Sequence, residues 1–417
     1  MPTRQSCCHD YAVSRRSLLR GMGAAAGEGL LTSALGGVHT QIAFGATALN
    51  PNTLVVLSLR GGADGLSIVV PHGDPGYAPE RPTIAVPTSS LLAKDAMFGL
   101  HPSLAPLLPM WDAGSFGAVQ AVGLPQPNRS HFAAMEEIED ADIGSPERRG
   151  WINRLIGLGG TADPVDGIQL GTPYISTSLY GVTPNLGLNN LTALNLPGAS
   201  GSMREQIRKS LESTWQPTKG SLGRGARSAL YTSSRLSYLT GAPEPSNGAQ
   251  YPNSDLGGSL ADAATLIRAR VGVRVITLDC GNWDMHANVG KIDTGSMKEN
   301  LDDLALSLAA FFTDIGSQSN EVTVVSLSEF GRRVAENGDH GLDHGYGNCV
   351  LAMGAGVRGR AVHGEWPGLG SSQVVDGDLR VTRDYRSVLW EILGARFPEV
   401  SLPLVFPGFT PETVGIA

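Results

Sequence analysis

Four short apolar runs, each followed by a glycine-rich or polar loop, constrain the fold of this 417-residue chain more than any other feature. Runs of this length without polar alternation are typical of buried strands in parallel sheets. They cover residues 54–59, 117–122, 273–278 and 322–327. Between them, apolar residues recur at helical spacing, as at Leu256, Leu260 and Ile267. The alternation predicts an α/β fold in which helices cover both faces of a mainly parallel sheet.

Other segments fit the same pattern less directly. We expect further helices over 103–111 and 301–315, another strand over 350–353, and a helix that begins after Ser130. Residues 160–255 differ, because Gly, Pro, Ser, Thr and Asn dominate them. We interpret this region as a loop-rich excursion with a polar helix at 203–211, which adds no central strand to the sheet.

The N-terminus has the features of an export signal. Arg15 and Arg16 are followed by two leucines, as in twin-arginine signals. A weakly apolar stretch at 21–38 is too poor an anchor for the membrane, and a small-residue cleavage site ends at Ala48. These features predict a signal peptide over 1–48, a single domain over 49–417, the twin-arginine translocase as a partner during export, and a periplasmic or secreted location.

Composition excludes some classes of partner. The formal net charge is −8, which argues against a nucleic-acid surface, since phosphate binding needs clustered Lys and Arg. No later stretch is apolar enough for a permanent membrane span. Of the 4 cysteines, two precede the arginine pair and would leave with the signal. The sequence leaves open whether Cys280 and Cys349 form a disulfide or stay free.

Acidic, imidazole and hydroxyl groups follow the predicted strands. In parallel α/β sheets, ligands bind beyond the carboxyl ends of the strands, so these side chains should meet at one edge. Carboxylates and neutral imidazoles are the ligands of divalent metals, and zinc, calcium and magnesium cannot be distinguished here. The candidate metal ligands are Asp64, Asp284, His286, Glu329, Asp343 and His344, and the candidate catalytic residues are Ser130 and His131.

Several local motifs carry a resemblance to a known family. They are LRGGADGL at 59–66, NRSHF at 128–132, WDMHA at 283–287, SEFGR at 328–332, DHG at 343–345 and GEWPGL at 364–369. In this order, from about Thr53 to about Pro398, they resemble the domain-of-unknown-function 1501 family. That family is similar to the alkaline phosphatase and sulfatase superfamily, and its members are usually exported by the twin-arginine route.

The resemblance implies roles for individual residues. Asp64 would be the acidic residue after the first strand, Ser130 the nucleophile, and Asp284 with His286 the middle Asp-and-His pair. The late strand allows two placements. In the first, residues 343–345 supply the Asp-His-Gly motif that is expected at the end of this strand. In the second, residues 328–331 occupy that strand end in place of the motif, and His344 is a later lone histidine. The second placement puts Phe330 where a metal-binding histidine is expected.

Two functions follow from these expectations. The first is an exported metal-dependent hydrolase of phosphate esters, with Ser130 as nucleophile and a small molecule or surface polymer as substrate. Sulfate esters are less favoured, because Ser130 lacks the Cys/Ser-x-Pro-x-Arg context of sulfatases. The alternative is a non-catalytic protein that keeps the fold, has a degraded metal site and binds a ligand or partner.

Overall fold

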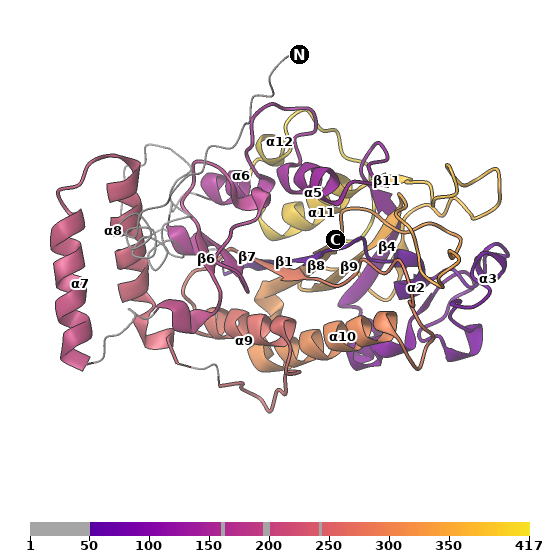
Figure 1. Ribbon diagram of the computed structural model, residues 1–417, viewed down its shortest axis with the longest axis horizontal. Coiled ribbons are helices and arrows are strands. Elements are labelled where there is room, and N and C mark those ends of the chain that lie inside the picture. The colour runs from indigo at the N-terminus through magenta and orange to yellow at the C-terminus, as the bar shows by residue number, and fades with distance from the viewer. Residues whose placement is uncertain (1–50, 160–162, 195–200, 242–243) are drawn as a thin grey trace, which may run out of the picture.

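The protein is described by a computed structural model over residues 51–159, 163–194, 201–241 and 244–417. The twin-arginine pair and the predicted cleavage site lie outside the described residues. Within these residues the main feature is a nine-stranded sheet (Figure 1). Its strands lie in the order β10 (Val362–His363), β4 (Phe116–Gly123), β9 (Asn348–Gly354), β8 (Val322–Leu327), β1 (Thr53–Leu59), β7 (Val275–Cys280), β5 (Gly167–Leu170) and β6 (Leu186–Leu188), and β11 (Arg383–Asp384) also pairs with β4.

Most strand pairs are parallel, as the apolar runs predict. The central strand β1 pairs in parallel with β7 and β8, at Leu54 with Val275 and Thr323 respectively. The exception is β9, which pairs antiparallel with both β4 and β8. The start of β9 therefore lies at the sheet edge where the parallel strands end, and this brings the loop before it to the same edge.

Helices cover both faces of the sheet, because alternate residues of each buried strand pack on opposite sides. Leu54 and Val56 belong to one core cluster, and Val55 and Leu57 to another. The first cluster includes residues of α5 (His131–Asp140), α6 (Trp151–Leu158), α11 (Tyr385–Arg396) and α12 (Leu402–Val405). The second includes residues of α9 (Asp255–Arg268) and α10 (Ser296–Ile315), and Figure 1 shows the two layers above and below the sheet.

The prediction that 160–255 adds no central strand is wrong. Strand β5 lies between β7 and β6, is parallel to both, and matches Ile168 to Ile276 of β7. Its four residues are all buried, although the Gly and Pro around them hide so short a run in the sequence. The predicted polar helix is present as α7 (Gly201–Trp215), which packs with α8 (Gly220–Arg235) beyond the β6 end of the sheet (Figure 1).

Short elements complete the described chain. The predicted helix over 103–111 is a 3-10 helix, Pro102–Leu107, continued by α4 (Leu108–Asp112). A small antiparallel pair, β2 (Val69–Val70) with β3 (Gly99–Leu100), lies outside the main sheet. The other short helices are α2 (Gly65–Ile68), α3 (Tyr77–Glu80) and the 3-10 turns Thr88–Ser90, Pro164–Asp166, Thr177–Leu179, Leu191–Leu194, Ser237–Leu239 and Gly316–Glu321.

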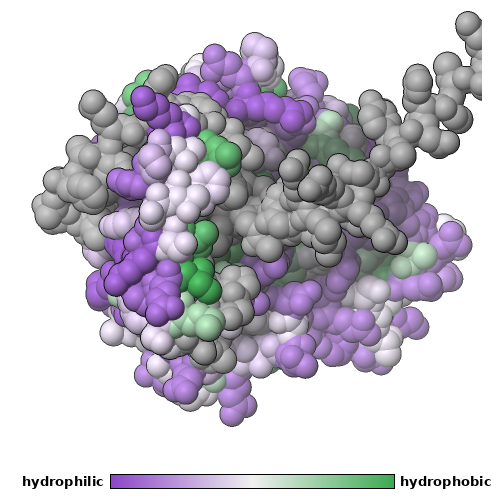
Figure 2. All heavy atoms as spheres, turned by 60° about the vertical axis from the view of Figure 1, so that its left-hand side comes forward, coloured by the Kyte–Doolittle hydropathy of each residue, from purple (hydrophilic) through white to green (hydrophobic). Residues whose placement is uncertain are grey.

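The described residues also bear on the expected lack of a membrane span and on the state of the two thiols. Among the described helices, none combines the length and hydropathy that a membrane span needs. Figure 2 brings the α7 end of the molecule forward. The coloured residues on this face are mostly hydrophilic, and a few hydrophobic side chains lie between them. Cys280 and Cys349 are both buried and free, so they form no disulfide with each other.

Candidate metal centre

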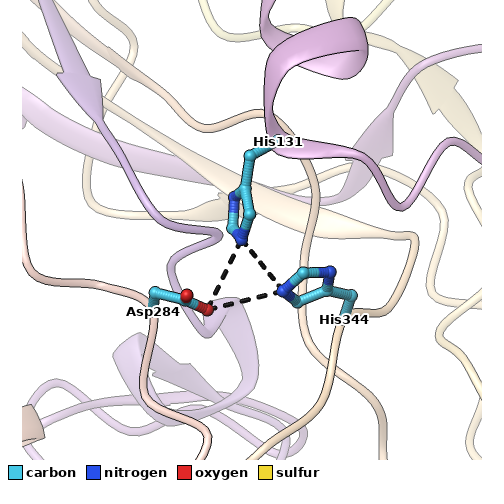
Figure 3. A group of neighbouring side chains, drawn as sticks. All are labelled: His131, Asp284 and His344. Carbon is cyan, nitrogen blue, oxygen red and sulfur yellow. Dashed lines mark hydrogen bonds and ion pairs between the residues drawn. The ribbon is translucent and has the colours of Figure 1, made fainter. Parts of the chain in front are cut away.

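The loops at one edge of the sheet bring three of the predicted side chains into a compact group. His131 is the first residue of α5, which follows β4, and Asp284 lies in the loop after β7. His344 precedes β9, and it reaches this edge because β9 runs antiparallel to its neighbours. Their ligand atoms all lie within 4.8 Å of one another, as Figure 3 shows.

The separations suit a single ion. Nε2 of His131 lies 2.9 Å from Nε2 of His344, and Oδ1 of Asp284 lies 3.5 Å and 3.4 Å from these two atoms. His286 joins from the solvent side, with its Nε2 2.9 Å from Nε2 of His344 and 3.0 Å from Oδ1 of Asp284. Ligand atoms at roughly 2.0 to 2.2 Å from a zinc-like ion lie within about 4 Å of each other, so the separations among His131, Asp284 and His344 are compatible with shared coordination. His286 lies next to this group and is not one of its three mutually close members.

The other ring nitrogen of each histidine faces an acceptor. Nδ1 of His131 lies 2.7 Å from Oε1 of Glu329, and Nδ1 of His286 lies 2.9 Å from Oδ1 of Asp343. Nδ1 of His344 lies 2.9 Å from the carbonyl oxygen of Arg129. Because carboxylate and carbonyl oxygens only accept, each Nδ1 must carry the proton and donate it.

The position of the proton on Nδ1 of each histidine bears on whether a metal ion could bind at the Nε2 atoms. A neutral imidazole with its proton on Nδ1 has a bare lone pair on Nε2. The Nε2 atoms of His131 and His344 and the Asp284 carboxylate oxygen all lie within 4.8 Å of one another. The Nε2 atom of His286 lies beside those of His344 and Asp284. Convergent acceptors repel unless a cation lies among them, and imidazoles oriented by acceptors on the far nitrogen are typical of metal ligands. The residues therefore fit a divalent metal ion.

Arg332 holds the Asp284 carboxylate through the same oxygen, Oδ1, that lies near the histidines. Its buried guanidinium donates to Oδ1 of Asp284 at 2.7 Å and to the backbone oxygen of Trp283 at 3.1 Å. It also donates to the backbone oxygens of Gly62 at 2.6 Å and Leu342 at 2.8 Å. One side chain thus ties together the loops that carry Asp284 and His344.

The electrostatics keep the group in the protonation state that a metal requires. Burial alone would raise the pKa of Asp284, but the hydrogen bond and charge of Arg332 outweigh it and lower that pKa. The hydrogen bond from His286, with one from Asn337, lowers the pKa of Asp343. Burial lowers the pKa of His344, against the effect of its bond to the Arg129 carbonyl. At neutral pH the two carboxylates are therefore anionic and His344 is neutral.

Asp64 does not join the group, which corrects its assignment as a metal ligand. Both of its carboxylate oxygens accept from the Arg81 guanidinium, at 2.5 Å and 2.9 Å, and both side chains are fully buried. Arg81 also donates to Ser67 Oγ and to the backbone oxygen of Val334. Both oxygens of Asp64 are thus committed to a buried ion pair, and Asp64 is not among the mutually close ligand atoms.

Glu329 and Asp343 also lie outside the group of ligand atoms. Each faces the Nδ1 side of a histidine, so it orients that histidine and does not face the ion position. Oε1 of Glu329 is further held by the backbone N–H of Gly61 at 2.8 Å. Phe330 is buried, and its ring lies 4.8 Å from the rings of both His131 and His344. It forms an apolar wall beside the two imidazoles.

Ser130 lies immediately before His131 and is exposed. It is the N-cap residue of α5, but its hydroxyl makes no capping hydrogen bond. Its backbone N–H donates to Oδ1 of Asn128 at 3.1 Å. The Ser130 hydroxyl is thus accessible to solvent next to the His131 position, with no described residue bonded to it.

Sequence reasoning missed three residues of this region. It assigned His131 to catalysis with Ser130, whereas the structure places its Nε2 among the ligand atoms. Arg332 ends the 328–332 motif, where the sequence suggests Glu329 as its ion-pair partner, whereas the structure pairs it with Asp284. Nothing in the sequence marks Arg81, which meets Asp64 only because the chain between them folds back.

Comparison with solved structures finds distant resemblances. A protein in the alkaline phosphatase superfamily from Vibrio parahaemolyticus shares 10% identity, with a TM-score of 0.32, over 82% of this chain and 71% of that one. The zinc complex of the C-terminal periplasmic domain of EcEptC from Escherichia coli shares 12%, with a TM-score of 0.28, over 74% of each chain. The lipoteichoic acid synthase LtaP from Listeria monocytogenes shares 8%, with a TM-score of 0.32, over 80% of this chain and 72% of that one. Because all three TM-scores are low, they assign no activity to this chain.

Comparison at the sequence level is more specific. No curated protein matches the chain. A family model does match, over a shorter range than the motifs suggest, since it covers about a third of the chain and does not reach 59–66 or 128–132. The matched part contains Asp284, His286 and His344 together with Glu329 and Asp343, but not His131. Residues 245–386, which carry most of the candidate metal centre, are thus similar to the family described as Protein of unknown function (DUF1501).

Proposed function

We propose that the protein is an exported metal-dependent hydrolase of phosphate esters, with sulfate esters as the less favoured substrate class. The observation that carries this proposal is the convergence of the Nε2 atoms of His131 and His344 with a carboxylate oxygen of Asp284, while the Nδ1 atom of each histidine faces an acceptor. When bound, a divalent ion would act there as a Lewis acid on an oxygen of the ester. His131, His344 and Asp284 would hold it, with His286 beside the last two.

The surroundings of the site suit a substrate that arrives from solvent. The side chains of Asp284 and His286 are about half exposed, at 50% and 46%, so the ion position is accessible from one side. Glu329, Asp343 and the Arg129 carbonyl fix the rings from the other side, which supports a preorganised site. A small ester or the exposed group of a surface polymer could reach such a position.

Ser130 is the candidate nucleophile. Its oxygen would attack phosphorus, the ester oxygen would leave as the alcohol with the serine proton, and water would then cleave the serine–phosphate bond. The support is its exposure and its place next to His131. A direct attack by water is the alternative within the same function, and Ser130→Ala separates the two, since only the first route needs the hydroxyl.

Export by the twin-arginine route belongs to the same proposal. It rests on Arg15–Arg16 and the small-residue site at Ala48, which lie outside the described residues. This route carries proteins that fold before export. A metal centre assembled in the cytoplasm would then reach the periplasm or the medium intact.

The test combines metal analysis with hydrolysis. The chain without its first 48 residues is purified without chelator, its metal content is measured, and it is assayed on aryl phosphate and aryl sulfate esters. We expect a bound divalent ion and phosphate release, both lost in His344→Ala and both kept in His72→Ala, which changes a histidine outside the group. A bound ion without hydrolysis of any ester would favour the ligand-binding alternative, and no ion at all would refute the metal site.

A further inference from the structure

The segment between β8 and β9 folds around the side-chain amide of Asn337. The Oδ1 atom of this amide accepts from the backbone N–H groups of Asp339 and Gly341, both at 3.0 Å. Two backbone donors on one side of the amide identify that side as the oxygen, since the amide nitrogen accepts no hydrogen bond. The orientation of the amide is therefore fixed, and its NH2 group points toward His286 and Asp343.

Both N–H groups of that amide have acceptors beside the candidate metal centre. Nδ2 of Asn337 donates to the backbone carbonyl oxygen of His286 at 2.8 Å and to Oδ1 of Asp343 at 3.1 Å. The same Oδ1 of Asp343 lies 2.9 Å from Nδ1 of His286. One amide thus holds His286 twice, directly at its backbone and, through Asp343, at its imidazole.

The loop of Asn337 lies directly against the loop of His286. The backbone N–H of Leu342 donates to the carbonyl oxygen of Met285 at 2.9 Å. A Cβ atom at Gly341 would lie 2.0 Å from the carbonyl oxygen of His286, so the absence of a side chain there permits the approach. The backbones of the two loops are thus in contact at the point where the Asn337 amide binds.

The side chains that Asn337 holds would otherwise have considerable freedom. His286 and Asp343 are 46% and 50% exposed, and both lie outside helices and strands. An exposed pair of this kind contributes little by itself, because two side chains lose rotamer freedom in order to hold one geometry. A fixed amide bonded to the same carboxylate oxygen restrains Asp343 independently of the imidazole, and so lowers the entropic cost of ordering His286.

We propose that Asn337 is a positioning residue of the candidate metal centre. It fixes Asp343 so that Nδ1 of His286 donates to it, and Nε2 of His286 then faces Oδ1 of Asp284 without a proton. The role rests on the proposed function of the same site. Aspartate would not suit position 337, because it offers no donor to the two acceptors and places a second negative charge next to Asp343.

The test is the tautomer of His286, measured by histidine nitrogen NMR on the mature chain at about pH 8, where an ordinary imidazole is neutral. His286→Gln identifies its signals. Asn337→Ala removes the amide, and Asn337→Asp removes only its donors while keeping the oxygen that shapes the loop. Both variants should lower the fraction of His286 whose Nε2 is free of a proton. Asn337→Ala should also weaken zinc binding roughly 10-fold, measured by calorimetry.

Two other histidines of the centre serve as internal controls. Glu329 and the Arg129 carbonyl hold the Nδ1 atoms of His131 and His344, so the tautomers of these two rings should be the same in every variant. The matched control is Asn320→Asp, which makes the same chemical change at an exposed asparagine outside the centre. It should leave all three rings and the zinc affinity unchanged.

The outcomes distinguish the role of Asn337 from the proposed function. A His286 that keeps its proton on Nδ1 in both Asn337 variants would overturn the positioning role, whether or not zinc binds. A tautomer that shifts as expected in a protein that binds no zinc would keep the role of Asn337 and refute the metal-dependent function. A change in all three histidines together would mean that Asn337 supports the loops in general, which would also overturn the role assigned to it.

Discussion

Oε1 of Glu329 lies 2.7 Å from Nδ1 of His131, on the side of the imidazole away from the candidate ion. The carboxylate is buried and also accepts from the backbone N–H of Gly61. Glu329 therefore links the loop after β1 to the first residue of α5. It directs Nε2 of His131 at Nε2 of His344, so a strand-end carboxylate orients a candidate ligand without lying among the ligand atoms.

Glu329→Gln should lower metal affinity about 10- to 100-fold, the usual cost of altering an outer-shell partner of a histidine ligand. The amide oxygen can still accept from His131, but the negative charge that strengthens the bond is gone. Zinc titration by calorimetry measures the change. Asp339→Asn is the matched control, since Asp339 is an exposed carboxylate of the same region that contacts none of the ligand atoms. Unchanged affinity in Glu329→Gln would mean that His131 needs no such orientation.

The protein should bind one divalent ion per chain at this edge of the sheet. Asp64, the other carboxylate that could support a second ion, has both oxygens on Arg81. Metal analysis after saturation and gel filtration gives the stoichiometry. Asp64→Asn should leave it at one, whereas Asp284→Asn should reduce it. Two tightly bound ions, one of them lost with Asp64→Asn, would show that Arg81 moves aside for a metal.

Arg81→Met should destabilise the fold by about 3 to 5 kcal/mol, because it leaves the Asp64 charge buried without a partner. The double change Asp64→Asn with Arg81→Met should recover part of the loss, as a neutral pair needs less compensation. Denaturant unfolding measures both. The charge of Arg81 outweighs burial and lowers the pKa of Asp64 from 3.8. The stabilisation that the Asp64–Arg81 ion pair contributes should thus be complete above about pH 4 and be lost as the pH falls further.

Stability should also fall between pH 6.5 and about 4 because of His101. This side chain is 1% exposed, and burial lowers its pKa from 6.5 to about 4. Its Nδ1 accepts from the backbone N–H of Ser103, which requires the unprotonated ring. In this window the unfolded chain binds more protons than the folded one, so the free energy of unfolding rises with pH, by about 3 kcal/mol across the whole window.

His101→Asn provides the test of that titration. An asparagine at the same position can also accept from the Ser103 N–H, so the cap is kept while the titratable group is removed. The pH dependence of unfolding should flatten in this variant and persist in His72→Asn. If both variants keep the same slope between pH 4 and 6.5, the dependence comes from other groups.

Replacing Arg15 and Arg16 together by Lys should trap the precursor in the cytoplasm, because the paired arginines are the recognised feature of the twin-arginine signal. Fractionation and N-terminal sequencing measure this outcome. The unaltered chain should be recovered outside the cytoplasm and begin after Ala48. Recovery of the doubly substituted chain outside, cut at the same place, would indicate another export route.

The sequence by itself determined the layers of this protein. Continuous apolar runs can only be buried on both faces, so strands such as β1 and β8 and the helices that cover them could be predicted from the pattern of apolar residues. It also identified Asp284, His286 and His344 as candidate metal ligands, because the motifs that contain them follow or precede strands. The sequence pattern did not predict β5, because four buried residues among glycines and prolines are too few to show the apolar pattern of a strand.

Only the tertiary structure decided which candidate ligand residues face the proposed ion position. Asp64 and Asp284 both follow parallel strands of the sheet, yet Arg81 takes both oxygens of the first, while Arg332 holds one oxygen of the second beside the histidines. Neither arginine is adjacent in sequence to its carboxylate. The direction of β9, which brings His344 to the same edge, depends on pairing with β4 and β8. Contacts between distant segments set these choices, and hydrophobic periodicity carries no information about them.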